Sequence, residues 1–424
     1  MGCLVADKIF GSTLQYSSPA HGGWGVLKAA QLIPESYFLF VSPAACGRHG
    51  AIGACLEARK ERVSYLFLEE RSIVTGDYEQ EVRQAVAQLL AHLKRKKKMP
   101  KVLGIFVSCI DDLLGTDNDS IVEELQTEYP DMRFLVCHMN PTSSDTGVPP
   151  GVNVMNKIHS LLEPERTHDN GVNLVGILSP LRKNSDLFRL LHEMHAEPVR
   201  HISDYDTVAS YQDMAKSRLN LVLGAMGKYA CRQLEARHHT PQVLTLTAFQ
   251  PAHIRENYEK IAGALQTQCP DLSDYEARAN EALLQTKEAL NGMPVFLDSG
   301  SIGRPFELTI ALKEAGINVT RIYASAVMPD DRESYEQVKE RFPEIEIAAP
   351  NAPTAFMKEK ERDRCLAIGY ASGYLSGAPH VVDIDGQHGL YGYQGLIDLC
   401  EMMRNAITKT IDLEQVLKDA VLIV

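Results

Sequence analysis

The sequence contains no hydrophobic run long enough to cross a membrane. Its longest apolar stretches, Val102 to Val107 and Val172 to Leu178, fall well short of the roughly 20 residues that a membrane-spanning helix requires. The amino-terminal segment MGCLVADKIFG also lacks a charged region followed by an apolar stretch, so no secretory signal is predicted. We therefore expect a cytoplasmic protein that does not bind a membrane.

An excess of positive charge is missing as well. The formal net charge of the 424 residues is -12, and binding to a phosphate backbone requires clustered positive charge. Nucleic acid is therefore excluded as the main partner. The exception is the basic run Lys94 to Lys98. It is either the solvated end of a helix, where lysines complement the helix dipole, or a docking patch for an acidic redox partner.

Paired cysteine motifs are absent. The nine cysteines are scattered along the chain without a CxxC or a compact ferredoxin-type run, and their number is odd. A disulfide framework is therefore not expected, and the reduced thiols of a cytoplasmic protein fit better. Cys231, Cys365 and Cys400 lie in apolar, helical-looking patterns, so we expect them to be small core residues.

The sequence does contain a repeated alternation of short β-branched runs with amphipathic helical stretches. This pattern predicts an α/β fold whose parallel sheets are covered by helices on both faces. Proline, glycine and serine gather at 142–171, and a second break at 291–294 follows a long polar helix. We therefore predict three Rossmann-like, doubly wound subdomains around a central cleft, with the boundaries 1–165, 166–290 and 291–424. The predicted strands are Val63 to Leu68, Lys101 to Ser108 and Arg133 to Cys137 in the first, Val172 to Leu178, Leu219 to Leu223 and Val243 to Thr247 in the second, and Val295 to Asp298, Val319 to Ala324, Ile345 to Ala348 and His380 to Ile384 in the third.

Two cysteines lie where such sheets bind ligands, in the loops that directly follow strands. Cys46 comes after FLFVSPAA and opens the loop CGRHG, while Cys109 follows KVLGIFVS and opens the turn CIDDLLGTD. A strand-end cysteine beside glycine or serine leaves room for an inorganic cluster whose sulfides accept hydrogen bonds from backbone NH groups. From spacing alone, each of the two is a cluster ligand, a catalytic thiol or a structural cysteine.

Several sequence blocks appear in a fixed order. From Trp24 they are WGVLKAAQLIP, SPAACGRHG, EERSIVTGDYEQEVRQAV and VSCIDDLLGTD, followed by SRLNLVLGAMGKYACRQLEARH and HVVDIDGQHGLYGYQGL. In this combination the chain resembles the nitrogenase component 1 family over nearly its whole length. Members of that family carry a His-Gly-Pro-x-x-Cys type loop, a Glu-x-x-Ile-Val-x-Gly-Gly segment, and a cysteine followed by an Ile-Gly-Asp-Asp type turn.

The resemblance implies that the first subdomain binds an oxygen-sensitive iron-sulfur cluster at a subunit interface. Cys46 and Cys109 then occupy the positions of two of its ligands, and Cys3 that of a third. The sequence departs from the family here, because Cys3 lies 43 residues before Cys46, farther than in most members. The implied cluster is either a larger, P-cluster-like group or, if Cys3 is not a ligand, a [4Fe-4S] cluster held by two cysteines from each of two subunits.

A second departure concerns the catalytic cofactor. Catalytic members of the family bind a large iron-sulfur cofactor through a cysteine, where the matching stretch LNLVLGAMG has Gly224. The resemblance therefore implies either a partner-type subunit, with the larger cofactor in its homologue, or a relative with a different substrate pocket. His380 matches the family's cofactor-ligating histidine loosely and is otherwise a hydrogen-bonded loop histidine. His388 and Tyr391 are candidate substrate contacts in the same predicted cleft.

By this resemblance, the chain is a subunit of a nitrogenase-like reductase that receives electrons from a separate ATP-dependent, P-loop iron-sulfur reductase. Its other partner is a homologous component 1 subunit, in an α2β2 heterotetramer or a homodimer. The chain has no GxxxxGK[ST] run, so no ATP site is expected in it. The missing thiolate favours multi-electron reduction of a substrate other than dinitrogen, such as a carbon-sulfur bond. The alternatives are a non-catalytic scaffold for metal-cluster assembly and a Rossmann-type protein without metal.

Two further kinds of loop have two interpretations each. The segment 299–304, SGSIGR, follows a strand and precedes a helix, so its NH groups either hold a phosphate or face the family's cofactor cleft. A set of acidic turns either caps helices and faces solvent or meets the reductase partner near the cluster. These turns contain Glu69, Glu70, Asp77, Asp111, Asp112 and Asp117.

Overall fold

The fold is α/β, as the alternating pattern predicts. The computed structural model describes residues 7–10, 25–44, 46–47, 60–139, 149–352, 355, 364–384 and 389–419. Within these residues the strands form three parallel sheets of four, four and five strands, together with a two-stranded antiparallel pair. None of the described helices is both long enough and apolar enough to cross a membrane.

The first sheet has the strand order β3-β2-β4-β5. Phe38 and Phe40 of β2 point to one face with Phe106 of β4, and this face packs against α1 and α7. The alternate residues Leu39 and Val41 point to the other face, under α4 and α6. This period of two is why every residue of β4 is buried, since both of its faces are covered. The bounds are β2 Ser36–Ser42, β3 Val63–Phe67, β4 Val102–Val107, β5 Arg133–His138, α1 Gly25–Gln31, α3 Glu70–Thr75, α4 Tyr78–Arg95, α5 Cys109–Leu114, α6 Asn118–Glu128 and α7 Pro150–Ser160.

The second sheet repeats the same strand order, β7-β6-β8-β9, and the third has the order β13-β11-β10-β14-β15. In both, the first strand of the unit lies inside the sheet and the chain winds outward in two directions, which is the doubly wound arrangement. The second unit contains β6 Val172–Val175, β7 Val199–Arg200, β8 Leu219–Val222, β9 Gln242–Leu244, α8 Asp186–Glu193, α9 Val208–Tyr211, α10 Gly227–His238 and α11 Pro251–Leu265. The third unit and its neighbours contain α12 Ser273–Leu290, β10 Val295–Asp298, α13 Pro305–Glu314, β11 Val319–Tyr323, α14 Arg332–Arg341, β13 Glu346–Ala348, β14 Leu366–Ile368, α15 Tyr370–Ser376, β15 His380–Val382, α16 Gly392–Ala406 and α17 Leu413–Asp419. The antiparallel pair joins β1 Asp7–Lys8 to β12 Ala326–Val327.

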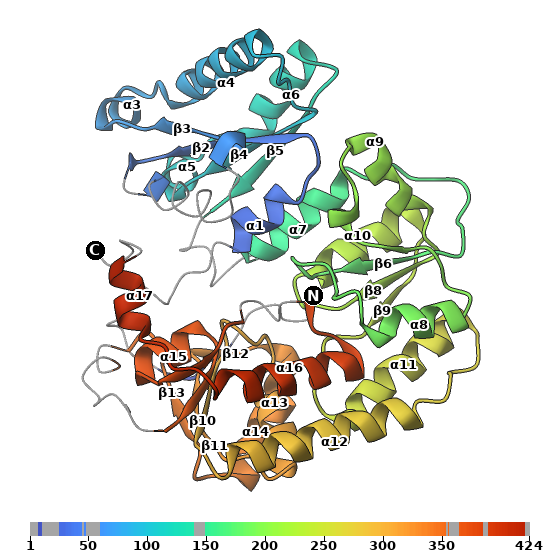
Figure 1. The fold of residues 1–424 in the computed structure, drawn as a ribbon. Helices are drawn as coiled ribbons and strands as arrows, with labels where there is room; N and C mark the ends of the chain where they lie inside the picture. The colour runs from blue at the N-terminus through green and yellow to red at the C-terminus, as the bar shows by residue number, and fades with distance from the viewer. Residues whose placement is uncertain are drawn as a thin grey trace.

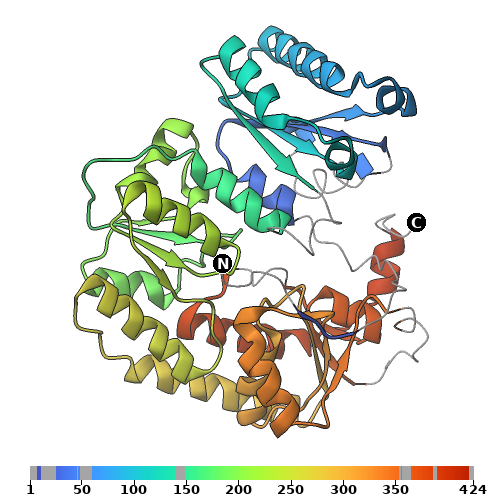
Figure 2. The ribbon, with the colours of Figure 1, turned by 180° about the vertical axis from the view of Figure 1, so that it is seen from behind.

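The three units form an arc with the second unit in the middle (Figures 1 and 2). Helix α7 joins the first two units, because it packs on β5 and α1 on one side and on α10 on the other. A single large core runs from β6 to α16 and joins the second unit to the third. Helix α7 lies inside the glycine- and proline-rich segment that was read as a break. The exact domain boundaries, after residues 165 and 290, stay a prediction.

Buried carboxylates cap helices across these joints. Asp331 accepts the backbone NH groups of Phe306 and Glu307, at 2.9 and 3.1 Å, at the start of α13. Glu307 in turn accepts those of Phe249 and Gln250, at 2.7 and 3.0 Å, at the start of α11. The free NH groups of a helix N-terminus carry partial positive charge, so a carboxylate stabilises them. The start of α13 and the start of α11 are thereby linked through the core.

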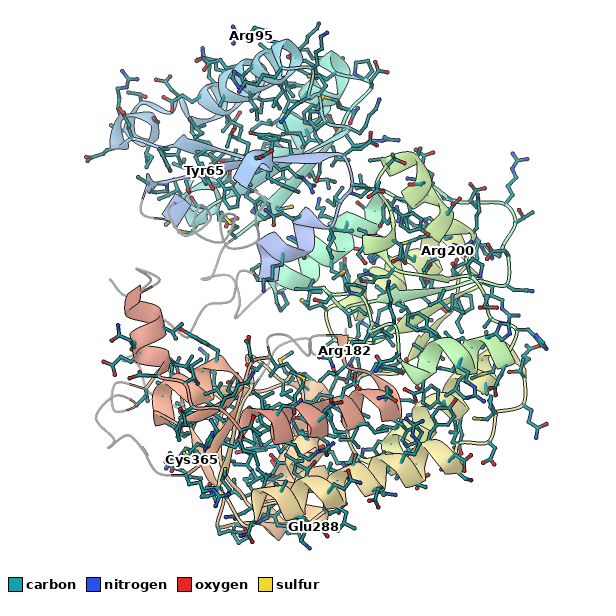
Figure 3. The ribbon with its side chains drawn as sticks, viewed as in Figure 1. Tyr65, Arg95, Arg182, Arg200, Glu288 and Cys365 are labelled. Atoms are coloured by element: carbon teal, nitrogen blue, oxygen red, sulfur yellow. The ribbon has the colours of Figure 1, made fainter. Side chains whose placement is uncertain are left out.

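The basic run Lys94 to Lys98 closes helix α4, and all five side chains are exposed. Figure 3 marks this end of the helix by Arg95. The segment leads directly into the amino end of β4, where Lys101 NH donates to the carbonyl of Glu35 at 2.8 Å. The run therefore lies at the amino edge of the first sheet, whereas Cys46 and Cys109 follow the carboxyl ends of its strands. This position favours the solvated helix end over a docking patch beside the cysteines.

Candidate functional site

Strands β2 and β4 are parallel neighbours, and their carboxyl ends coincide. Val41 pairs with Val107, and the NH group of Ser108 donates to the carbonyl of Val41 at 3.2 Å. The chain leaves β2 toward β3 on one side and leaves β4 toward β5 on the other. This divergence makes the β2–β4 edge the topological switch point, where open α/β sheets bind their ligands.

Cys46 lies in the loop beyond β2 and is exposed. The NH groups of Cys46 and Gly47 both donate to the carbonyl of Pro43, at 3.0 Å each, so the loop turns back over the strand end. A Cβ atom on Gly47 would lie 2.7 Å from the ring of Phe67 and 3.0 Å from Oγ of Ser42. A side chain at this position would have to displace Phe67 or Ser42, so glycine favours the close approach of the Cys46 loop to the ends of β2 and β3.

Cys109 is the first residue of α5 and is half-buried with a free thiol. Cys269 is half-buried as well. The remaining cysteines of the described segments, apart from Cys46, are enclosed in cores. Burial raises the pKa of Cys137 to about 12 and that of Cys400 to about 11, so both stay protonated. Cys231, Cys365 and Cys400 are buried, as expected for small core residues. Cys365 precedes β14 and is not helical, and Cys3 lies outside the described residues.

Two buried hydroxyl groups lie at the same switch point. Ser42 and Ser108 are the residues directly at the ends of β2 and β4, and their Oγ atoms have no hydrogen-bond partner among the residues that the structure describes. A buried polar group without a partner indicates that a further acceptor belongs there. Two accessible thiols and two unpaired donors at one edge are a donor set that fits an iron-sulfur cluster.

Several large apolar side chains are exposed near this edge. Leu113 is 81% exposed and Leu114 41% on α5, while Val74 is 77% exposed on α3 and Phe67 50% at the end of β3. Phe67 is the last residue of β3, and the other three lie on the helices that follow β3 and β4. Several large apolar side chains gathered in one place indicate a surface that another protein covers.

The acidic turns have separate roles. Asp117 caps α6 by accepting the NH group of Ser120 at 3.0 Å, whereas Glu69, Glu70 and Asp77 are exposed. Asp111 is buried and accepts hydrogen bonds from the Tyr78 hydroxyl, at 2.9 Å, and from the Asn118 amide, at 2.7 Å. Together with Asp112 and His138, Asp111 places three ligand atoms within 4.8 Å of one another. The internal hydrogen bonds already explain that grouping, and α5 is thereby fixed on the sheet.

His380 and Tyr391 are both held by structural contacts, and His388 lies outside the described residues. His380 begins β15, at the amino edge of the third sheet, and its Nδ1 lies 2.6 Å from the carbonyl oxygen of Lys409. Tyr391 is only 2% exposed, its ring meets that of Tyr258 edge-on, and burial raises the pKa of its hydroxyl. The structure therefore favours the structural interpretation of both residues.

The switch points of the other two sheets are closed by the chain itself. In the second, a Cβ atom on Gly224 would lie 2.1 Å from the carbonyl oxygen of Gly176, so a cysteine does not fit at this position. In the third, Asp298 accepts the NH groups of Ser301 and Ser372, at 2.7 and 3.0 Å. Asp331 already accepts the first NH groups of the following helix α13. These internal acceptors already bind the NH group of Ser301 and the first NH groups of α13, which favours the family's cofactor cleft over a phosphate as the interpretation of the loop 299–304.

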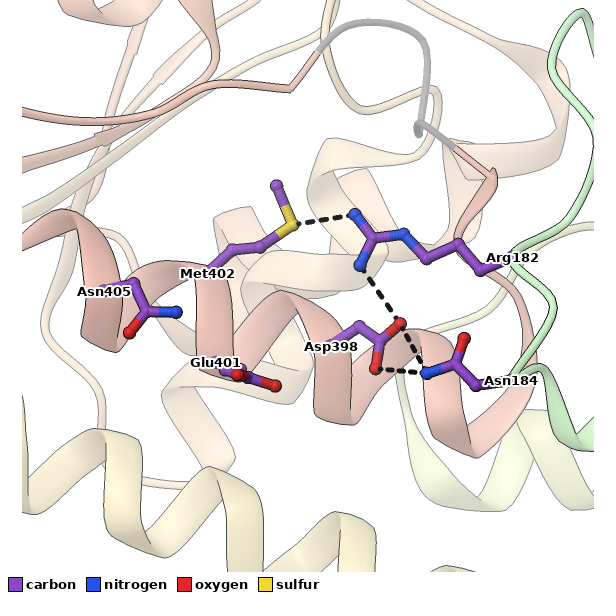
Figure 4. A pocket seen from close by; sticks show the side chains of 6 residues that line it. All are labelled: Arg182, Asn184, Asp398, Glu401, Met402 and Asn405. Carbon is purple, nitrogen blue, oxygen red and sulfur yellow. Dashed lines mark hydrogen bonds and ion pairs between the residues drawn. The ribbon is translucent and has the colours of Figure 1, made fainter.

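A polar pocket of about 360 Å³ lies between α16 and the loop after β6 (Figure 4). The guanidinium of Arg182 donates to Asp398 at 3.1 Å, and the amide of Asn184 donates to the same carboxylate at 3.2 Å. Glu401, Met402 and Asn405 complete the lining. No local sequence pattern predicts this pocket, because its two sides are more than 200 residues apart. The Arg182–Asp398 ion pair joins the second unit to the third.

The comparisons with known proteins agree with this architecture. Residues 22–408 match the family of nitrogenase component 1 type oxidoreductases, and the chain belongs to that family. Among curated proteins, it is 21% identical over 379 residues to the nitrogenase iron-molybdenum cofactor biosynthesis protein NifE of Methanococcus maripaludis, covering 80% of this chain and 72% of the relative. The solved structure of nitrogenase Cp1 at pH 6.5 is similar with a TM-score of 0.70 at 16% identity, over 95% of each chain. Nitrogenase Cp1 at pH 5 gives 0.62 at 13% identity, over 95% and 90%. These structural likenesses establish the shared fold.

Proposed function

We propose that this chain is a subunit of a nitrogenase-like reductase that holds an iron-sulfur cluster through Cys46 and Cys109 at a subunit interface. It receives electrons there from an ATP-dependent iron-sulfur reductase and supports a multi-electron reduction in the cytoplasm. The observation that carries the proposal is the coincidence of the β2 and β4 carboxyl ends. This coincidence supports a common site for the two accessible thiols, because each lies in the loop or turn beyond one of these strands. A cluster bound there supplies one-electron storage.

The exposed apolar side chains beside the cysteines support a partner subunit at this edge. Leu113 and Val74 are each more than three-quarters exposed, although they flank the loops that hold the proposed ligands. A homologous component 1 subunit, in a homodimer or an α2β2 heterotetramer, would cover them. Two cysteines from each subunit complete the four thiolates of a [4Fe-4S] cluster, and a larger P-cluster-like group requires a further ligand such as Cys3.

The packing at Gly224 bears on the substrate. The Gly176 backbone fills the space that a side chain at position 224 would need, so no thiolate is available at the place where catalytic relatives bind their large cofactor. We infer that any such cofactor is held by the partner subunit. For the same reason, a substrate other than dinitrogen is proposed, and reduction of a carbon-sulfur bond is one such reaction.

The test is anaerobic purification of the chain with any co-purifying subunit, followed by iron and sulfide quantitation and EPR spectroscopy. Cys46→Ala and Cys109→Ala should each abolish the cluster signal. Cys231→Ala is the matched control, because that thiol is buried in the second unit and should leave the signal intact. Wild-type protein without iron, or both edge variants with full iron content, would rule the proposal out.

A second candidate function is a non-catalytic scaffold that assembles a metal cluster and passes it on. It is favoured by the similarity to NifE, a cofactor biosynthesis protein, and by the closed position at Gly224. Turnover separates the two. With the cognate ATP-dependent reductase, a reductase subunit consumes electrons over many cycles, whereas a scaffold releases its cluster to an acceptor protein and consumes none catalytically.

A further inference from the structure

A row of side chains on one face of the first sheet changes from aromatic to polar at the carboxyl edge. Phe40 and Phe106 stack across β2 and β4 with ring centroids 4.8 Å apart. Since side chains alternate along a strand, the residues two positions further on, Ser42 and Ser108, lie on the same face. Phe67 of β3 is opposite Ser42 in the register. The two serines therefore end an otherwise apolar row.

The hydroxyl groups of these two buried serines have no partner, unlike that of the buried Ser36. Ser42 is 0% exposed and Ser108 4%, and neither Oγ atom has a hydrogen-bond partner in the described part of the chain. Ser36, at the opposite end of β2, donates to the carbonyl of Ile33 at 2.7 Å. Buried hydroxyl groups are almost always hydrogen-bonded in native proteins. An unpaired hydroxyl at each of two adjacent strand ends therefore points to an acceptor shared by this edge.

The two serines lie directly beside the proposed cluster ligands. The Cα atom of Gly47, the residue after Cys46, lies so close to Ser42 that an added Cβ atom would be 3.0 Å from its Oγ. Ser108 is joined by one peptide bond to Cys109. Both hydroxyl groups are thus at the base of the loops that carry the thiols. A cluster bound by the Cys46 and Cys109 loops would bring sulfur atoms to this place, and sulfur can accept these hydrogen bonds.

We propose that Ser42 and Ser108 are positioning residues whose hydroxyl groups donate hydrogen bonds to the sulfur atoms of the cluster and of its cysteine ligands, and thereby raise the cluster's reduction potential. The inference rests on the proposed function. Its physical basis is that an O–H donor stabilises negative charge on sulfur, and the reduced cluster carries one more negative charge than the oxidised cluster. Removing a donor therefore lowers the potential.

The test is a redox titration of anaerobically purified protein, followed by EPR spectroscopy, on Ser42→Ala, Ser108→Ala and the double variant. At the wild-type midpoint potential, each single variant should show a several-fold lower ratio of reduced to oxidised cluster. The double variant should approach a tenfold loss, which corresponds to 59 mV for a one-electron couple. Pulsed EPR in deuterated buffer should also show weaker coupling to exchangeable deuterons. Ser36→Ala, at the other end of the same strand, is the matched control and should leave the potential unchanged.

Threonine variants separate the hydroxyl group from its packing. Ser42→Thr and Ser108→Thr keep a donor, so they should retain the wild-type midpoint, even if the alanine variants lose their iron. Alanine variants with full iron and an unchanged midpoint would overturn the inference, because the hydroxyl groups would then be satisfied by water alone. Threonine variants that shift the midpoint as alanine does would overturn it too. A wild-type protein without any cluster would instead overturn the proposed function itself.

Discussion

Asp186 accepts a hydrogen bond of 2.8 Å from the hydroxyl group of Tyr258 inside the core that joins the second and third units. The same carboxylate accepts the backbone NH groups of Tyr393 and Gln394, at 3.1 Å each, in the first turn of α16. A residue of α8 in the second unit therefore caps a helix of the third. Burial raises the pKa of Asp186, while these three hydrogen bonds act in the opposite direction. Asp186 is therefore one of the contacts that hold the two units together, beside the shared core and the Arg182–Asp398 ion pair.

Replacing Asp186 with alanine should destabilise the protein by about 2 to 4 kcal/mol, because it leaves buried donors without an acceptor. Tyr258→Phe, which removes one donor, should cost only about 1 kcal/mol. Denaturant unfolding monitored by circular dichroism measures both. Asp213→Ala is a suitable control, since its ion pair with Lys216 is nearly half exposed and should contribute less than about 1 kcal/mol. An Asp186→Ala protein as stable as the control would contradict this account.

The stability of the third unit should depend on the titration of Asp331. Burial is the largest cause that raises its pKa from the ordinary value of 3.8 to about 7. Between these two pH values the folded state binds more protons than the unfolded state. The contribution of protonated Asp331 to the free energy of unfolding is therefore complete below about pH 4 and is lost as the pH rises through 7. Thermal unfolding from pH 5 to 8 should show a falling melting temperature, with a contribution on the order of 1 to 4 kcal/mol from this group. Asp331→Asn should flatten the slope, and a variant that keeps the wild-type slope would assign the effect to another residue.

The sequence was sufficient for the elements whose signal is local. Strand Val295–Asp298 has the bounds that its apolar run predicted, and β4 and β5 differ from prediction by a residue or two. The two-residue strand β7 and the three-residue strand β14 were missed, because runs this short carry no periodicity. Helix α7 was read as a break, although a proline also suits the first position of a helix.

The same distinction holds for the candidate site. Cys46 and Cys109 could be chosen from sequence because each lies in the loop or turn that comes after its own strand. That Ser42 and Ser108 lie side by side depends on the pairing of β2 with β4, which no local pattern reveals. The position of His380 at an amino edge likewise depends on the pairing of β15 with β14. Strand order is set by contacts between distant residues, so it becomes visible only in the fold.

Introducing the family's missing thiol should fail on steric grounds. In Gly224→Cys, the new Cβ atom would lie 2.1 Å from the backbone oxygen of Gly176, and backbone atoms do not yield as the end of a side chain does. We expect a loss of several kcal/mol in unfolding free energy or an insoluble protein. Gly263→Ala is the matched control, because its Cβ atom meets nothing within 4 Å on the exposed face of α11. That variant should be neutral or more stable by up to about 1 kcal/mol. A stable Gly224→Cys protein would reopen the possibility of a cofactor ligand at this position.

The apolar surface beside the cysteines should govern assembly without affecting the fold. Leu113 is 81% exposed in the isolated chain, so Leu113→Ser removes little buried contact and should leave the unfolding free energy nearly unchanged. If a homologous subunit covers α5, the same change should weaken association by about 1.5 to 3 kcal/mol, which is tenfold or more in the dissociation constant. Sedimentation velocity on anaerobically purified protein measures this. Leu284→Ser, on an exposed face of α12 in another part of the molecule, should leave assembly intact. Equal weakening by both substitutions would place the contact elsewhere, because only a specific interface at the switch-point edge distinguishes the two leucines.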